Sequence, residues 1–188
     1  DFSHGPVHGY RRELNFASGE ALVSYTSDRY RYSRQYVAHL EKDLIFARFC
    51  CEDEPFTARI GLDRNPDSLC RLEWNSKEGL LSLDGRIDKG IEFRLETQYW
   101  FDGGTSRFDA NGCVVIDKTR EIVLAINTGT SVCSVTPEQE CTESRLKFLE
   151  LPNWDDLLAD HVEKHRTHYG GMSLELPLKE IDLPTDRR

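Results

Sequence analysis

The sequence lacks several features that mark common classes of protein. No stretch approaches the roughly 18 to 20 consecutive apolar residues that a membrane-spanning helix needs. There is no Cys-x-x-Cys pair, which most structural zinc sites use, and no Gly-x-Ser-x-Gly elbow or phosphate-binding glycine loop. The sequence therefore predicts no membrane span, no structural zinc and no cofactor, and it contains no recognisable catalytic motif.

Positive charge is also scarce. The 188 residues include 24 Lys and Arg against 33 Asp and Glu, which gives a formal net charge of -9 at pH 7. Because a phosphate backbone is bound by concentrated Lys and Arg, this balance argues against nucleic acid as a partner. Neutral sugars and other small molecules remain open as ligands.

The amino terminus and the cysteines say little about the cellular compartment. The chain begins with Asp1 and not Met, which suggests a mature or excised piece, and it has no Asn-x-Ser/Thr glycosylation acceptor. The even number of cysteines permits disulfides, and a bond between Cys133 and Cys141 would close one loop. Free buried thiols are an equal alternative. The six positions are Cys50, Cys51, Cys70, Cys113, Cys133 and Cys141.

The most informative stretch covers residues 10–38. It has the pattern of three consecutive β-strands, with turns at Gly19 and at Ser27-Asp28. The third strand alternates with period two, which is typical of a strand with two different environments. One face of this third strand is rich in tyrosine. That face either docks on a neighbouring domain or packs in the core. Its residues are Tyr30, Tyr32, Arg34 and Tyr36.

Strand patterns continue through most of the chain. Apolar or alternating runs cover residues 43–51, 91–101 and 121–128, and Asn111-Gly112 is a strong hairpin signal. About ten strands precede any helix, at the spacing of an antiparallel sandwich. We therefore predict a mainly β fold, an antiparallel β-sandwich with one or two carboxy-terminal linker helices.

The pattern becomes helical near Thr136. Pro137 followed by Glu138 favours a helix start, and the expected helix covers residues 138–149. Asn153 is a good N-cap for a second helix, which Gly170-Gly171 would end.

A short apolar run at residues 172–176 has the pattern of a strand that returns to a sheet. These changes divide the chain into two parts. We expect a β-sandwich domain at 1–135, and a helical linker with the returning strand at 136–188.

One aromatic cluster has the character of a sugar-binding site. Tyr99 and Trp100 are followed by Asp102, and aromatic rings at a strand end can stack on a sugar whose hydroxyl groups a carboxylate binds. The commoner role of such large aromatic residues is to cover the end of a core. Carboxylates are plentiful, but nothing in the sequence selects a catalytic pair of the glycosidase type.

Three histidines share one face of the second predicted helix. His161, His165 and His168 lie at positions i, i+4 and i+7, where three imidazoles could bind a metal ion. The surrounding sequence is not the His-Glu-x-x-His pattern of zinc proteases. A solvated or partner-facing histidine stripe is therefore favoured, and we expect no metal.

Four segments, taken in order, resemble glycoside hydrolase family 95, whose members include α-L-fucosidases. The resemblance is to the family's amino-terminal β-sandwich domain, a super-sandwich, and to its linker, and it covers nearly the whole chain. Gly170-Gly171 departs from the family's usual polar and Arg residues. The four segments are YRRELNFASGEALVSYTSDRYRYSRQYVAH, IVLAINTGTSV, LLADHVEKHRTHYGGMSLEL and DLPTDRR.

This resemblance implies a non-catalytic fragment of a larger enzyme, in which the sandwich domain is amino-terminally incomplete. In that family, inverting hydrolysis takes place in a following (α/α)6 barrel, so no catalytic residue is carried over to this chain. The implied partners are the barrel and, through the parent enzyme, fucosylated glycans, and the implied location is extracellular or periplasmic. A stand-alone carbohydrate-binding sandwich is the alternative. The residues expected to face the barrel are Tyr30, Tyr32, Tyr36, His161 and His165.

Overall fold

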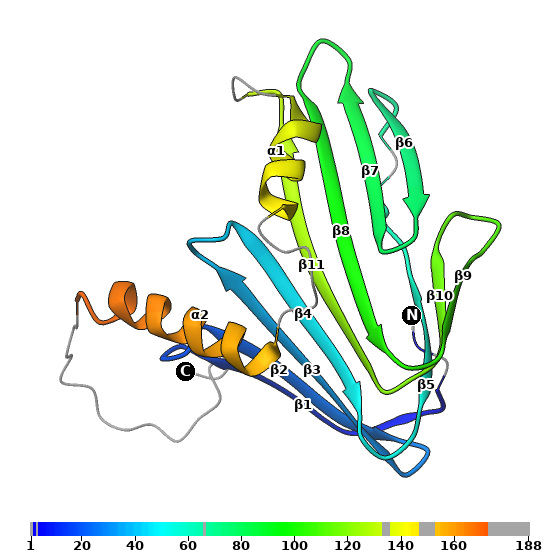
Figure 1. Cartoon of the computed structure of the whole chain (residues 1–188), viewed down its shortest axis with the longest axis vertical. Coiled ribbons are helices and arrows are strands. Elements are labelled where there is room, and N and C mark those ends of the chain that lie inside the picture. Colours follow the sequence, from blue (N-terminus) through cyan, green and yellow to red (C-terminus); the bar gives the residue numbers. More distant parts are fainter. Residues whose placement is uncertain (1, 3, 66, 133–135, 147–152, 173–188) are drawn as a thin grey trace.

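In its described residues the protein is mainly antiparallel β-sheet, with two helices in the carboxy-terminal part (Figure 1). The computed structural model describes residues 2, 4–65, 67–132, 136–146 and 153–172. The elements in these residues are β1 (Val7–Asn15), β2 (Glu20–Ser27), β3 (Tyr30–His39), β4 (Leu44–Cys51), β5 (Phe56–Ile60), β6 (Cys70–Lys77), β7 (Leu80–Ile87), β8 (Glu92–Asp102), β9 (Thr105–Phe108), β10 (Val114–Thr119), β11 (Glu121–Thr130), α1 (Pro137–Arg145) and α2 (Trp154–Tyr169).

The strands form two sheets of very different size. The large sheet has the order β1-β2-β3-β4-β11-β8-β7-β6, and the small sheet has the order β5-β10-β9. Every neighbouring pair in both sheets is antiparallel. The predicted fold class, an antiparallel sandwich with carboxy-terminal helices, is confirmed.

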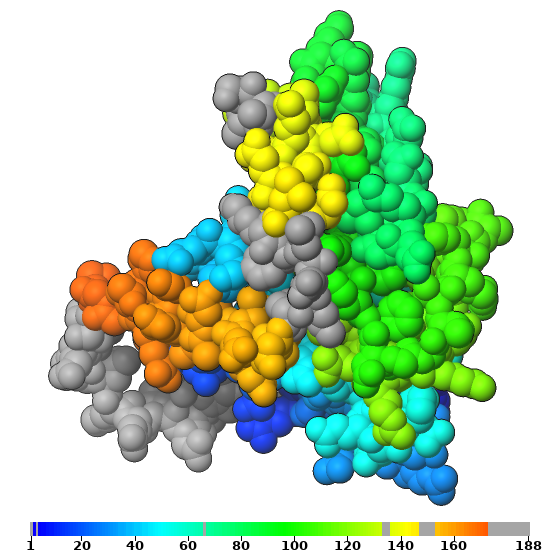
Figure 2. Space-filling view, in the orientation of Figure 1, coloured from blue at the N-terminus to red at the C-terminus, as the bar shows by residue number. Residues whose placement is uncertain are grey.

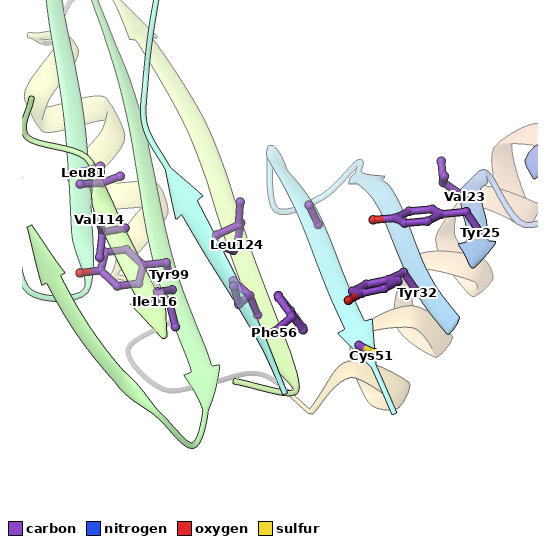
Figure 3. Packing of buried hydrophobic residues seen from close by; sticks show 13 residues of the cluster. Val23, Tyr25, Tyr32, Cys51, Phe56, Leu81, Tyr99, Val114, Ile116 and Leu124 are labelled. Atoms are coloured by element: carbon purple, nitrogen blue, oxygen red, sulfur yellow. The ribbon is translucent and has the colours of Figure 1, made fainter. Parts of the chain in front are cut away.

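The central strands of the large sheet, such as β4 and β11, are buried on both faces, and this explains their continuous apolar runs. In β11, Ile122 and Leu124 point into a core shared with the small sheet, while Val123 and Ala125 point into a core shared with α2. Alternate residues of a strand face opposite sides, so one apolar run can serve two cores. Figure 3 shows Leu124 and Phe56 in the core between the sheets.

The two helices cover the opposite face of the large sheet from the small sheet. Helix α1 packs on β11 and β8. Helix α2 contacts β3, toward the other edge of the large sheet (Figure 2). Trp154 and Leu157 of α2 enter the second core beside Val37 and Phe46. The same core contains Val123 and Ala125 of β11, so the side chains that bind α2 come from strands far apart in the sequence.

The turns follow the local signals in the sequence. Gly19 and Gly112 have φ values of +68° and +74°, a region that residues with a Cβ rarely adopt. Gly112 closes the β9–β10 hairpin, in which Val114 pairs with Phe108. The predicted turn at Ser27-Asp28 is also present, with Asp28 at φ +48°.

The helices begin where their caps predict. Thr136 accepts a hydrogen bond from the backbone N–H of Gln139, and Asn153 accepts from those of Asp155 and Asp156. Helix α1 is shorter than expected: it ends at Arg145, and residues 147–149 lie outside the described part of the chain. The expected returning strand falls on residues 172–176, of which only Met172 is described, with no regular structure.

The cysteines in the described residues are free thiols. Cys141 is completely buried, and burial raises its pKa to about 12. The expected partner for a disulfide, Cys133, lies outside the described residues. Neither helix among the described residues is long and apolar enough to span a membrane.

Candidate functional site

The tyrosine face of β3 lies between the sheets. Tyr32 is 8% exposed and stacks on Tyr25 of β2, with ring centroids 5.2 Å apart (Figure 3). Phe56 of the small sheet meets the same ring edge-on at 6.2 Å. Tyr32 is therefore a core residue, and its expected role in docking a separate domain stays a prediction. Tyr30 and Tyr36 are partly exposed at the margin of this core, and their docking role stays a prediction.

The proposed sugar-stacking cluster is divided between the two faces of β8. Tyr99 is 4% exposed and lies in the core between the sheets, whereas Trp100 packs on the α2 side. Asp102 is exposed at the end of the strand. Because neighbouring strand residues point in opposite directions, Tyr99 and Trp100 cannot form one platform for a sugar. Tyr99 thus has the core position that was the alternative, and a sugar-binding role for any of the three residues stays a prediction.

The histidine stripe of α2 faces the protein's own sheet at one end and solvent at the other. His161 is 2% exposed, His165 is half-buried and His168 is exposed. The rings of His161 and His165 stack at 5.8 Å, and His165 Nε2 lies 2.7 Å from the backbone oxygen of Phe16. Within the described residues, no group of three His, Cys, Asp or Glu side chains could hold a metal ion.

A second histidine connects the sheet to this helix. His39 of β3 is buried, and in the tautomer with a proton on Nε2 it donates to Asp160 of α2 at 3.0 Å. Lys42 donates to the same carboxylate oxygen at 2.6 Å. Burial lowers the pKa of His39, and the charge of Lys42 lowers it further, so these effects outweigh the opposing pull of Asp160.

His161 is expected to be neutral for the same main reason. Burial lowers its pKa, and the neighbouring His165 also disfavours a second positive charge. The backbone groups of Ser18 and Gly19 and the charge of Glu20 raise the pKa of His161, but burial, the largest effect, outweighs them. The uncharged imidazoles of His39 and His161 therefore lie between the large sheet and α2. Protonating either one would place a positive charge in a buried site, which costs free energy.

This arrangement predicts acid-sensitive docking of α2. Lowered pKa values of His39 and His161 mean that the unfolded chain binds more protons below about pH 6.5, so stability falls as pH falls through that value. We expect the free energy of unfolding to be flat above about pH 7 and to decline below about 6.5. Urea titrations across this range, followed by tryptophan fluorescence, measure it.

Two variants provide the control. His161→Leu removes a buried titrating group and should flatten the decline, while His168→Gln changes an exposed residue and should leave it unaltered. If the stability of His161→Leu depended on pH as much as that of the native chain, the decline at low pH could not be assigned to His161.

A cleft of about 680 Å³ lies between the two sheets. Residues 58–63 line one side, and Arg34, Phe49 and Trp74 line the other. The guanidinium of Arg34 lies 4.6 Å from the ring centre of Phe2 and donates to the Tyr25 hydroxyl at 2.8 Å. The indole N–H of the half-exposed Trp74 donates to the Leu62 carbonyl at 3.0 Å.

Sequence reasoning did not identify this cleft. Arg34 was visible as a charge within the tyrosine face of its strand, but its neighbours come from β4, β5 and β6. Only the pairing of these distant strands brings them together. No local pattern in the sequence could have found them.

Comparison with known proteins assigns the sandwich to a family. Residues 1–134 match the model described as glycosyl hydrolase family 65, N-terminal domain. The chain belongs to this family. No curated protein matches the chain. Among solved structures, a putative kojibiose phosphorylase from human microbiome matches with a TM-score of 0.59 and 11% identity, covering 88% of this chain and 25% of that one.

The family 65 match corrects one expectation and supports another. The sequence motifs had indicated family 95, whereas the matching model is that of family 65. The coarser prediction, an amino-terminal β-sandwich domain of a glycoside hydrolase family, is confirmed. The chain spans a quarter of the kojibiose phosphorylase that it matches, and at 11% identity that likeness shows the fold alone.

Proposed function

We propose that this family 65 domain is the non-catalytic sandwich and linker part of a larger glycoside-cleaving enzyme. Its role is to hold a catalytic (α/α)6 barrel in place through the linker. One observation carries the proposal: α2, which follows the matched residues, is seated on the large sheet by Trp154, Leu157 and His161. A seated helix fixes the direction in which the chain leaves the sandwich.

The division of the chain forms part of this proposal. The sandwich occupies residues 1–135 and the linker residues 136–188. The family match, which ends at residue 134, and the cap at Thr136 support this boundary. Both helices nevertheless pack on the sheet, so the linker and the sandwich are expected to unfold together.

Two substrate classes are proposed for the parent enzyme. The first is kojibiose cleaved by phosphate, which follows the name of the structurally similar protein. The second is a terminal α-L-fucoside cleaved by water, which follows the sequence motifs. The two differ in product, since phosphorolysis releases a sugar phosphate and hydrolysis releases a free sugar.

The proposal is tested by assaying the chain alone and joined to the domain that follows it in its reading frame. The 188-residue chain should give no product above the buffer control, either from kojibiose with inorganic phosphate or from an aryl α-L-fucoside. The longer protein should turn over one of them. Turnover by the chain alone would show that it is itself catalytic, and a longer protein without a helical barrel would remove the proposed partner.

A further inference from the structure

We propose that the β6–β7 hairpin carries a binding site for a phosphate monoester of a polyhydroxylated molecule, such as a sugar phosphate. The phosphate binds to Arg71, Arg86 and Lys89, and the hydroxyl groups bind to the polar face of the sheet beside them. The site lies at the edge of the large sheet that β6 forms (Figure 1), and its lining residues differ from those of the cleft between the sheets. It does not depend on the proposed role of the domain in a larger enzyme.

The first observation is a pair of like charges directly opposite each other. Arg71 of β6 pairs with Arg86 of β7 in the antiparallel ladder, so both side chains project from the same face of the sheet. Like charges in this position destabilise a sheet. Glu92 lies 3.5 Å from Arg86, but it offsets only part of the charge because both side chains are at least half exposed. An anion between the two guanidinium groups removes the repulsion.

The second observation is a hollow of about 390 Å³ around this pair. The backbone N–H of Asp88 donates to the Leu69 carbonyl at 2.7 Å, which fastens the β7–β8 turn to the loop before β6. Lys89 lies in this tight turn, with φ +56°. Three cationic side chains and one carboxylate therefore surround the hollow, in a chain whose net charge is -9. The lining residues are Ser68, Leu69, Arg71, Arg86, Asp88 and Lys89.

Phosphate is the anion that suits this set of donors. Directly opposite residues of two strands have Cβ atoms about 4.5 to 5.5 Å apart, so Arg71 and Arg86 can close on one anion. A guanidinium group presents paired N–H donors to phosphate oxygens, and a lysine adds a point charge. A phosphate monoester carries a charge of about -1.5 to -2 at pH 7 and three acceptor oxygens. It can therefore bind both guanidinium groups and the ammonium group of Lys89 together, whereas a carboxylate has fewer acceptors and less charge.

The third observation is a second hollow that shares the arginine pair. It has a volume of about 700 Å³, and Arg71 and Arg86 line it together with Glu73 and Asn75 of β6. The side-chain oxygens of Glu73 and Asn75 accept hydrogen bonds from hydroxyl groups. Glu73 is two residues from Arg71 on the same face of the strand, about 6.6 Å along it, a separation that one sugar ring can span. A phosphate held by Arg71 thus places attached hydroxyl groups beside Glu73.

The test is an NMR titration of the 188-residue chain, labelled with nitrogen-15, with glucose 6-phosphate, inorganic phosphate and glucose. The ionic strength is held constant at about pH 7.5, above the second phosphate pKa of about 6. We expect saturable shifts of the backbone amide signals of Leu69, Arg71 and Lys89. Glucose 6-phosphate should bind about threefold or more tightly than inorganic phosphate, because its hydroxyl groups add hydrogen bonds, and glucose should not bind.

Three variants separate the two parts of the site. Arg71→Gln should weaken the binding of both phosphates by about tenfold or more, since hydrogen bonds between charged groups are the strongest available here. Arg12→Gln removes the same charge from the exposed strand β1, at the opposite edge of the large sheet, and should leave both affinities unchanged. Glu73→Ala should reduce the affinity for glucose 6-phosphate to that for inorganic phosphate without weakening the latter.

Urea unfolding without ligand shows whether Arg71 is needed for the fold. Because Arg71 faces a like charge, Arg71→Gln should leave the urea midpoint unchanged or raise it. A lower midpoint would overturn the argument from like charge, since it would mean that Arg71 stabilises the hairpin.

Three binding results would also overturn the proposal. Equal weakening by Arg71→Gln and Arg12→Gln would reduce the binding to general attraction between charges. Glucose bound as tightly as glucose 6-phosphate would make this a site for neutral sugars. Equal affinities for glucose 6-phosphate and inorganic phosphate in the native chain would assign the site to free phosphate and exclude the ester.

Discussion

Replacing Phe46 by alanine should lower the free energy of unfolding by about 3 to 5 kcal/mol, the usual cost of a large core truncation. Phe46 is 0% exposed and lies in the core between the large sheet and α2, beside Val37, Val123 and Trp154. Truncation removes apolar contacts from both the strand and the helix. Urea unfolding monitored by circular dichroism measures the loss.

Ile45 is the matched control for this change. It is the preceding residue on β4 but points to the other face and is 49% exposed, so Ile45→Ala should cost about 1 kcal/mol or less. Hydrogen exchange should also show faster opening of α2 in Phe46→Ala than in Ile45→Ala. Similar losses in the two variants would mean that α2 is not seated on this core.

The contrast between Phe46 and Ile45 marks the limit of what the sequence could predict. The continuous apolar run of β4 indicated a buried strand, and the structure confirms it. The run does not reveal which residue faces which layer. That depends on α2 and on the small sheet, whose contacts with β4 arise from residues far along the chain.

Signals that act over a few residues were dependable. Gly19 and the Asn111-Gly112 pair marked turns, and Asn153 marked the start of α2, because each effect depends on neighbouring backbone atoms. Pairings such as Val123 with Arg48 and Trp100 join strands that are distant in the sequence. Their order in the sheet could not be derived from local pattern.

In the candidate site, too, local patterns could be read from the sequence and contacts between distant residues could not. Strand alternation already implies that Tyr99 and Trp100 point in opposite directions, so their placement on two faces of β8 could be predicted from sequence. Helical spacing correctly grouped His161 with His165, but it could not say that His161 faces the protein's own sheet. The cleft beside β5 joins strands that no spacing rule connects.

Glu96 provides the other large expected effect, because it is a charge buried beneath α1. Its side chain is 2% exposed and lies between two guanidinium groups, with Arg145 Nε donating at 2.7 Å and Arg94 Nε at 3.2 Å. Arg94 also donates to Asp84 and to Ser82. Glu96 falls on the same face of β8 as Arg94, and α1 packs on β8 there.

Replacing Glu96 by glutamine keeps the size of the side chain and removes its charge. Arg94 and Arg145 then lose their shared counter-charge in a buried site, which should cost about 3 to 5 kcal/mol of unfolding free energy. Glu92→Gln on the same strand is the control. Its side chain is 50% exposed and lies 3.5 Å from Arg86, so it should change stability by less than about 1 kcal/mol.

A double-mutant cycle separates the ion pair from simple loss of packing. If Glu96 and Arg145 act together across the interface of β8 and α1, Arg145→Gln should cost much less in the Glu96→Gln background than in the native chain. Additive losses would instead mean that Arg145 and Glu96 stabilise the fold independently. In that case α1 would be held mainly by Cys141 and by the hydrogen bond from Asn127 to its backbone, at 2.8 Å.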